Sequence, residues 1–248
     1  MSRHIRFERL HNFRDLGGYP AGGGEYAVRW GRLYRADSLG KLAGEDWERF
    51  LELGVAGVID LRYPWEIEAK GRVPEHASFA YHNLSIEHRP YDQPSQAPDV
   101  EPGPFLAGKF MEVAEDGVKE LRQALDVIAG TDGPVVFHCA SGKDRTGQLA
   151  ALVLTLLGVP EDVVVDDFAL TRLATPRLLA DWIAEHDGRT PTWPAYPDAP
   201  AEVMRLYLAA MADTYGSVNA YAAERLGVDP DLLAALRARL LEPVTLPA

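Results

Sequence analysis

Cysteine is nearly absent from this chain of 248 residues, in which Cys139 is the single example. One cysteine excludes an internal disulfide and also excludes a zinc site built on paired thiolates. The 7 histidines show no spacing typical of metal ligands, so we expect no metal and no other cofactor. A lone thiol suits a cytoplasmic protein, which is our prediction, and secretion without a signal peptide stays open as an alternative.

Long apolar runs and positive charge are also scarce. The longest apolar run, residues 149–159, is too short to span a bilayer, and residues 1–7 lack the apolar core of a signal peptide. We therefore expect no integral membrane segment. The formal net charge of −12 argues against a nucleic-acid partner and gives no sign of a polybasic membrane patch. An anionic substrate would have to meet a local basic site, for which the candidates are Arg14, Arg35, Arg62, Lys143 and Arg145.

The single thiol lies in a stretch whose pattern indicates phosphate chemistry. Residues 138–147 read His-Cys-Ala-Ser-Gly-Lys-Asp-Arg-Thr-Gly, at the junction of a strand-like run at 133–138 and a helix-like run at 146–157. A loop at a helix N-terminus directs backbone amides at an oxyanion, and the same surroundings lower the pKa of a thiol. The planar guanidinium of Arg145 can bind phosphate oxygens with two donors. The stretch therefore predicts that Cys139 is a nucleophile acting on phosphate esters.

This stretch resembles the signature loop of cysteine-dependent phosphatases, His-Cys-x-x-Gly-x-x-Arg-(Ser/Thr)-Gly, at every defined position. Residues 12–18, Asn-Phe-Arg-Asp-Leu-Gly-Gly, and 58–62, Val-Ile-Asp-Leu-Arg, are similar to two further motifs of one family. That family is the bacterial atypical tyrosine phosphatases, whose loop reads His-Cys-x-x-Gly-Lys-Asp-Arg-Thr-Gly. The resemblance runs from residue 8 to the C-terminal helices and is loose between the motifs.

The resemblance implies a two-step reaction at residues 139–145, which we call the signature loop. Cys139 would attack phosphorus and form a phosphocysteine, which water would then hydrolyse. Arg145 and the loop amides would stabilise the phosphate oxygens throughout, and Thr146 would donate to the thiolate. The Lys143 side chain is expected at the rim of the pocket, where it would meet the additional phosphates of an inositol head group. The alternative is a solvated lysine that only raises the local positive potential. The residues expected to bind substrate are Ala140, Ser141, Gly142, Lys143, Thr146, Arg14, Arg62 and Asp60.

The general acid that protonates the leaving oxygen is a separate question. Common tyrosine phosphatases carry this aspartate on a loop ahead of the cysteine, but residues 104–108 of this chain contain no aspartate. The family pattern favours Asp144, inside the signature loop. Asp60, Asp92 and Asp99 are the alternatives, and Asp60 could instead be a structural partner of a loop arginine.

Helix-like and strand-like segments alternate along the first two thirds of the chain, which predicts an α/β fold. We expect a central, largely parallel sheet flanked by helices, with the site at the carboxyl end of a strand. The expected strands are residues 32–38, 55–61, 79–84 and 133–138, and the expected helices before the C-terminal part are 44–53, 106–129 and 146–157. The rest reads as helices at 161–173, 176–185, 201–215, 218–226 and 231–241. We expect one domain, 1–248, in which 161–215 either forms a helical lid or simply covers one face of the sheet.

Three functions follow from these features. The first is a dual-specificity-like phosphatase acting on phosphotyrosine, with phosphoserine, phosphothreonine and phosphoinositides as further substrates, so the partner would be a phosphorylated protein or a phosphoinositide. The second is a non-catalytic phosphate-binding module, although an inactive module usually loses Cys139, Asp144 or Arg145. The third is another thiol enzyme, such as a rhodanese-like sulfurtransferase or an arsenate reductase, and a reductase would need a second cysteine.

Overall fold

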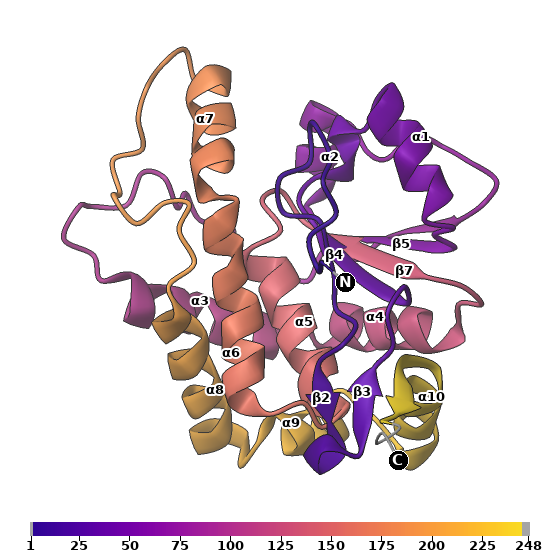
Figure 1. Ribbon diagram of the computed structural model, residues 1–248. Coiled ribbons are helices and arrows are strands. Elements are labelled where there is room, and N and C mark those ends of the chain that lie inside the picture. The colour runs from indigo at the N-terminus through magenta and orange to yellow at the C-terminus, as the bar shows by residue number, and fades with distance from the viewer. Residues whose placement is uncertain (1, 245–248) are drawn as a thin grey trace.

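A five-stranded sheet in the order β1-β4-β7-β5-β6 forms the centre of the protein in a computed structural model that describes residues 2–244 (Figure 1). The four strands β4 (Leu33–Ala36), β7 (Val135–His138), β5 (Gly57–Asp60) and β6 (Ala80–Asn83) run parallel. The short β1 (Arg14–Asp15) pairs antiparallel with β4 at one edge. The predicted α/β class with a largely parallel central sheet is confirmed.

The central strand β7 explains the two hydrophobic cores, because successive side chains of a strand point to opposite faces. Val136 joins the smaller core, which includes Phe13, Tyr34 and Phe50 from α1 (Glu45–Glu52). Val135 and Phe137 join the larger core on the other face. Helices supply most of the larger core. They are α3 (Pro102–Asp116), α4 (Val118–Gly130), α5 (Asp144–Leu156), α6 (Glu161–Ala169), α8 (Ala201–Tyr215), α9 (Val218–Glu224) and α10 (Pro230–Leu240).

The expected single helix over 106–129 is wrong, because the chain forms α3 and α4 with a break at Gly117. A Cβ at this position would lie 2.3 Å from the carbonyl oxygen of Ile86, so the close approach of the two backbones requires glycine. The expected helix 161–173 is also interrupted, since α6 ends at Ala169 and a 3-10 turn, η3 (Leu170–Leu173), follows.

Besides the short edge strand β1 and short 3-10 turns, two features were not expected from the sequence. The helix α2 (Pro64–Lys70) directly follows the Asp-Leu-Arg stretch at the end of β5. The second is a small antiparallel sheet in the order β2-β3-β8, which joins the N-terminal hairpin of β2 (Pro20–Ala21) and β3 (Tyr26–Val28) to β8 (Leu241–Pro243). Between β2 and β3 lies the short 3-10 turn η1 (Gly22–Gly24), and η2 (Leu39–Lys41) follows β4.

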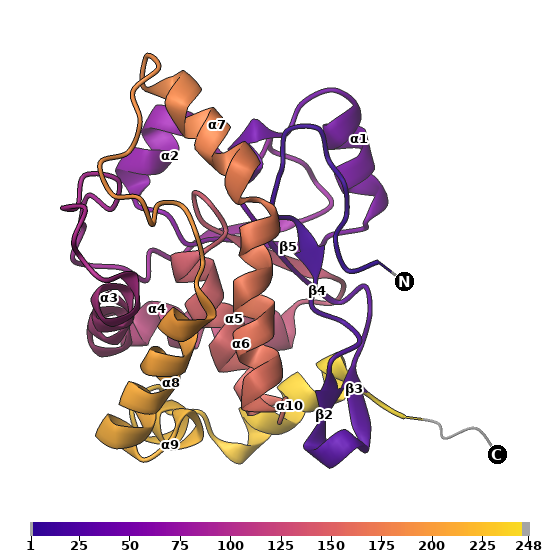
Figure 2. The same ribbon diagram turned by 60° about the vertical axis from the view of Figure 1, so that its left-hand side comes forward.

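The helix α7 (Thr175–Glu185) projects from the body beyond the end of α6 (Figure 1). In the turned view it lies beside α2, on the side of the sheet edge where β4 and β5 end (Figure 2). Residues 186–200 return along α7 to the start of α8 without regular secondary structure. Within residues 2–244, no helix has the length and apolar character needed to cross a membrane.

Candidate active site

The register of three parallel strands gathers the site at one edge of the sheet. Ala36 of β4 and Asp60 of β5 both pair with His138 of β7, so the residues that follow these strands emerge side by side. Cys139 is the first residue after β7 and is buried, and α5 begins at Asp144. The thiol therefore lies where parallel strands present ligand sites, next to a helix N-terminus.

Gly142 gives the signature loop its turn. Its φ is +69°, and a Cβ there would lie 2.5 Å from the carbonyl oxygen of Ala36. Both features require glycine, because other residues strain in this backbone region and the neighbouring atom belongs to the backbone. The loop is therefore seated directly against the end of β4.

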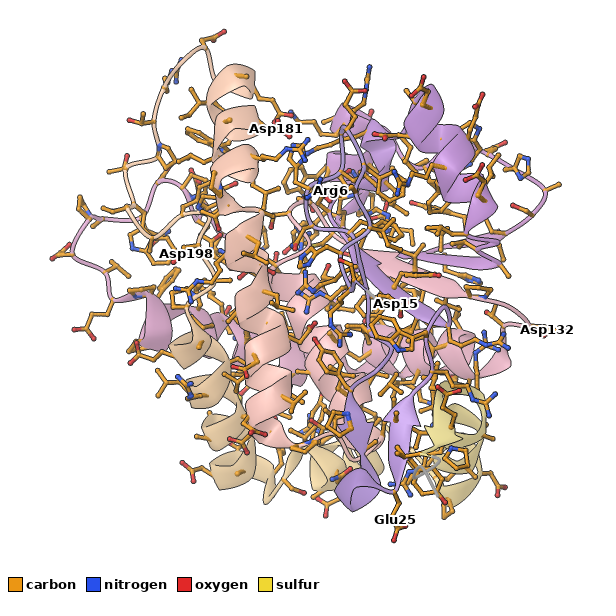
Figure 3. The ribbon with its side chains drawn as sticks, in the orientation of Figure 1. Arg6, Asp15, Glu25, Asp132, Asp181 and Asp198 are labelled. Carbon is orange, nitrogen blue, oxygen red and sulfur yellow. The ribbon has the colours of Figure 1, made fainter. Side chains whose placement is uncertain are left out.

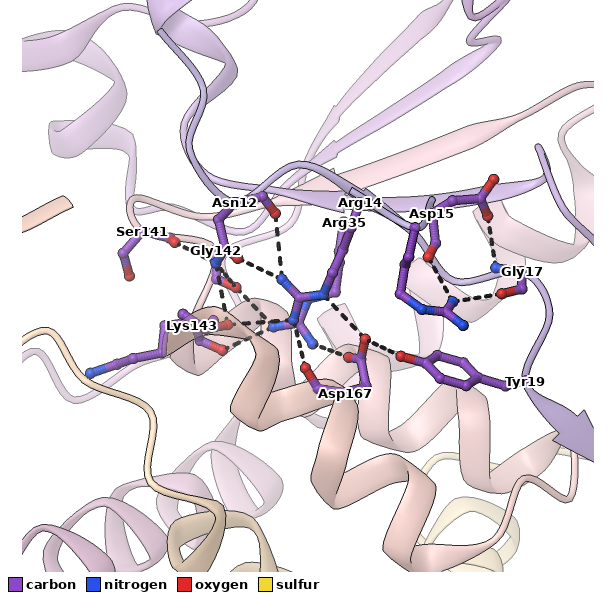
Figure 4. A network of polar contacts seen from close by, with 12 residues as sticks. Asn12, Arg14, Asp15, Gly17, Tyr19, Arg35, Ser141, Gly142, Lys143 and Asp167 are labelled. Carbon is purple, nitrogen blue, oxygen red and sulfur yellow. Dashed lines mark hydrogen bonds and ion pairs between the residues drawn. The ribbon is translucent and has the colours of Figure 1, made fainter. Parts of the chain in front are cut away.

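Two buried side chains hold the carbonyls of the signature loop from behind (Figure 4). Asn12 Nδ2 donates to the carbonyls of Ser141 at 3.0 Å and Gly142 at 3.1 Å, and Arg35 Nη2 donates to Gly142 at 2.8 Å. No backbone amide of residues 140–143 donates to a partner within the described chain. Because the carbonyls are held on one side, these amides are available to bind an anion on the other side.

Asp167 on α6 anchors this support. Its carboxylate accepts from Arg14 Nε at 3.2 Å, from Arg35 Nη1 at 2.5 Å and from the Tyr19 hydroxyl at 2.9 Å. Burial alone would raise the pKa of Asp167, but the two guanidiniums outweigh it and hold that pKa well below its ordinary value. Burial, together with the charge of Arg14, lowers the pKa of Arg35 to about 10. Arg14 thus lies behind the signature loop, and its direct contact with substrate stays a prediction.

Asp60 and Arg62 form a second buried pair beside the loop. Arg62 donates from Nε to Asp60 Oδ1 at 2.9 Å and from Nη2 to Oδ2 at 2.6 Å, and its Nη1 donates to Ser38 Oγ at 3.0 Å. The Tyr81 hydroxyl donates to Asp60 Oδ2 at 3.0 Å. Both oxygens of Asp60 are thus engaged by Arg62 and Tyr81, and its contact with substrate stays a prediction. Arg62 also lines the cavity described below.

Arg145 is held by a residue that the sequence did not single out. Glu66 on α2 accepts from Arg145 Nη1 at 2.5 Å and from Nη2 at 3.0 Å. Burial would lower the pKa of Arg145, but the Glu66 carboxylate and the negative charge of Cys139 raise it well above its ordinary value. Pro64 followed by a glutamate at the third helical position is a helix-start signal, which could have predicted α2 but not the contact with Arg145.

Lys143 differs from the expectation that its side chain lies at the pocket rim. The side chain is fully buried, and Nζ donates to Gln93 Oε1 and to the Asp198 carbonyl, both at 3.1 Å. Its neighbour Asp144 lies 3.6 Å from Nζ through Oδ2, while Oδ1 is buried without a partner in residues 2–244. The hydroxyl of Thr146 is likewise buried without a described partner. The remaining candidates for the acid, Asp92 and Asp99, are exposed.

A cavity of about 430 Å³ opens beside the signature loop. Its lining includes Ala140 and Ser141 of the signature loop and three aromatic side chains, Trp65 of α2, Trp182 of α7 and Tyr196. This mixture of loop amides and aromatic walls suits a phosphate carried on an apolar or aromatic group. The part of the chain that the structure describes has no cluster of three or more His, Cys, Asp or Glu side chains that could hold a metal ion.

Ion pairs hold α7 across this cavity. Asp181 lies on the side of α7 that faces the sheet (Figure 3) and accepts from His11 Nε2 at 2.9 Å and from Lys41 Nζ at 2.7 Å. One turn further along α7, Glu185 accepts from Lys70 of α2 at 3.0 Å. The second pair is exposed on both sides, so it contributes little by itself.

Known proteins resemble this chain over most of its length. Residues 5–242 match the family model described as the tyrosine phosphatase family. A protein of Cupriavidus necator assigned to the tyrosine-protein phosphatases is 33% identical over 92% of this chain and 86% of its own length. The triple specificity protein phosphatase PtpB of Mycobacterium tuberculosis is 26% identical over 85% of this chain and 89% of its own length. Among solved structures, TpbA of P. aeruginosa aligns over 77% of this chain and 96% of its own, with a TM-score of 0.32 and 16% identity.

Proposed function

The chain belongs to the tyrosine phosphatase family, and we propose that it hydrolyses phosphotyrosine through a phosphocysteine formed on Cys139. The observation that carries this proposal is the signature loop itself. A buried thiol lies at the end of β7, the amides of residues 140–143 have no described partner, and Arg145 closes the loop. This arrangement can bind a phosphate dianion and, with the same donors, the three equatorial oxygens of the trigonal-bipyramidal transition state of phosphoryl transfer.

The proposed hydrolysis has two steps, and both use these groups. In the first, the Cys139 thiolate forms a bond to phosphorus while the bond to the leaving oxygen breaks, and a proton from an acid makes the leaving group neutral. In the second, water attacks the phosphocysteine, gives its proton to a base and releases inorganic phosphate and the thiolate. The loop amides and Arg145 bind the equatorial oxygens in both steps.

We assign the acid role to Asp144. Its Oδ1 is the carboxylate atom near the signature loop that has no described partner, whereas both oxygens of Asp60 accept hydrogen bonds from Arg62. Asp92 and Asp99 are exposed and, like Asp144, are not among the residues that line the cavity. Asp144 is favoured because it lies inside the signature loop and its Oδ1 has no described partner that would compete for the proton.

The range of substrates follows from the cavity. Aromatic walls at Trp65, Trp182 and Tyr196 favour an aryl phosphate such as phosphotyrosine. Activity on phosphoserine, phosphothreonine and phosphoinositides is the wider form of this proposal, and the relative from M. tuberculosis is named for triple specificity. For Lys143 to bind a second phosphate of an inositide, its ammonium would have to leave Gln93 and the Asp198 carbonyl.

We further propose a single domain in which α7 acts as the lid. Within 161–215, α6 and α8 contribute many buried side chains to the main core, and the segment 186–200 contributes Trp193 and Ala199, so these parts belong to the body. The helix α7 has one buried residue, Leu178, which is not part of that core, and the helix lines the cavity. A reactive thiol is best preserved in a reducing compartment, and the cytoplasm is part of the proposal.

One assay tests the function. Phosphate release is measured with a phosphotyrosine peptide, a phosphoserine peptide and a phosphoinositide, using the wild-type protein and Cys139→Ser. We expect turnover of phosphotyrosine by the wild type and none by Cys139→Ser, because a serine hydroxyl stays protonated where a thiol ionises. Phosphate binding without turnover by the wild type would favour the non-catalytic module, and full activity of Cys139→Ser would refute the nucleophile.

A further inference from the structure

The contact between Arg145 and Glu66 has a specific geometry. The two carboxylate oxygens of Glu66 face the two terminal nitrogens of Arg145, so the pair meets end-on. A guanidinium has five N–H donors, and this contact uses one from each terminal nitrogen. Arg145 makes no other hydrogen bond to residues 2–244. The Nε edge of the guanidinium is therefore free to donate two parallel hydrogen bonds to a phosphate.

Glu66 is itself fixed by the start of α2. Its Oε2 also accepts from the backbone amide of Tyr63 at 2.9 Å, in the capping box of that helix. The Tyr63 ring lies 5.6 Å from the Arg145 guanidinium and stacks on Trp65 at 5.4 Å. The carboxylate thus links the arginine of the signature loop to the backbone of α2 and to the aromatic wall of the cavity.

Both side chains are mostly enclosed, with 11% of Arg145 and 14% of Glu66 exposed. A partly buried bidentate pair is stronger than an exposed pair, because water screens it less. Without Glu66, Arg145 would keep no described hydrogen bond, and the carboxylate left near it would be Glu87, which acts on it through charge alone. The plane of the guanidinium would then no longer be fixed by a bidentate contact.

We propose that Glu66 is a positioning residue for the reaction, which sets the plane of the Arg145 guanidinium so that its Nε edge faces the phosphate. This inference rests on the proposed phosphatase function. Glu66 itself does not touch the substrate, because both its oxygens are occupied by Arg145 and Tyr63. The helix α2 thereby becomes part of the catalytic apparatus, although it lies outside the signature loop.

A purely structural role for Glu66, as the cap of α2, makes a different prediction. Glu66→Gln keeps the size of the side chain and one carbonyl oxygen, which can still accept from the Tyr63 amide. Its amide nitrogen cannot accept from Arg145, so one of the two bonds is lost and the other loses its ionic partner. A residue that only capped α2 would show little change in activity with this variant.

The test measures kcat and KM with a phosphotyrosine peptide, and the affinity for inorganic phosphate by calorimetry. We expect Glu66→Gln to lower kcat/KM by about 10- to 100-fold, the range of a hydrogen bond between charged groups, mainly through kcat. The matched control is Glu68→Gln on an exposed position of the same helix, which should behave as the wild type. Unchanged activity of Glu66→Gln in a folded protein would overturn the proposal.

A double-mutant cycle with Arg145→Lys keeps the proposal testable if Glu66→Gln also loses stability. A lysine has no planar fork to orient, so Glu66→Gln should cost much less in this background than in the wild type. Additive losses would overturn the positioning role. If the wild type has no phosphatase activity, the proposed function fails, and phosphate affinity alone still decides whether Glu66 orients Arg145: a decrease in Glu66→Gln supports it, and no change refutes it.

Discussion

Asp167→Asn is expected to destabilise the protein strongly, because Asp167 neutralises two guanidiniums that are fully buried. Asparagine keeps the shape but removes the charge, which leaves Arg14 and Arg35 next to each other without an anion. Breaking a buried ion pair from one side costs about 3–5 kcal/mol. The free energy of unfolding of a natural domain is about 5–15 kcal/mol, so the loss is a large fraction of the total.

Chemical unfolding in urea measures this change, with Asp166→Asn as the matched control because Asp166 is exposed on the same helix. A loss of 3–5 kcal/mol should lower the melting temperature by about 6–20 °C in a domain of this size. Asp166→Asn should change the free energy of unfolding by less than about 0.5 kcal/mol. A loss below about 1 kcal/mol for Asp167→Asn would refute the argument, since it would show that the two arginines do not need the anion.

The same group predicts a dependence on pH with a definite sign. The pKa of Asp167 is lower in the folded state than its ordinary value of 3.8, so folding favours the ionised form. Its contribution to stability is then complete above that ordinary value and is lost as the pH falls towards the folded-state pKa. The wild type should therefore lose stability below about pH 4 more steeply than Asp167→Asn does.

Three further variants test the signature loop. Asp144→Asn should lower the rate of hydrolysis of a phosphotyrosine peptide far more than that of an activated aryl phosphate, whose leaving group departs without an acid. Equal losses of rate on both substrates would show that another residue is the acid. Gly142→Ala should cost about 1–3 kcal/mol of stability in urea unfolding and weaken phosphate binding, because its φ is +69° and its Cβ would meet Ala36. Lys143→Ala should lower activity on phosphotyrosine and phosphoinositides alike by about 10-fold, since its ammonium is bound inside the protein. A loss confined to phosphoinositides would instead show that Lys143 reaches the substrate.

The features that were predicted from the sequence are local ones. The strand before Cys139 and the helix after it follow from a short β-branched run, a loop and an unbroken apolar helix, all within 25 residues, 133–157. The glycine at 142 was identified with its neighbours by the same pattern. Local propensity and motif spacing are sufficient here, because one continuous segment builds the loop.

The features that were missed depend on distant contacts. Nothing in the sequence near Arg14 or Arg35 indicates that both pair with Asp167, more than a hundred residues further along the chain. The contact of Glu66 with Arg145 spans 79 residues. The break at Gly117 comes from the backbone of Ile86, so the helical pattern over 106–129 alone could not show it. Pairing partners of this kind are set by the packing of the whole fold.

The strand order has a consequence for how the chain is made. β7 separates β4 from β5 in the sheet, yet it is synthesised about a hundred residues after β4. Until residues 135–138 have left the ribosome, β4 and β5 each have an unpaired edge facing the gap, and such edges invite pairing with other chains. The segment that fills the gap also delivers Cys139, so closure of the sheet and assembly of the phosphate-binding site are one event in folding. A nascent chain that ends before β7 is therefore both inactive and prone to aggregate.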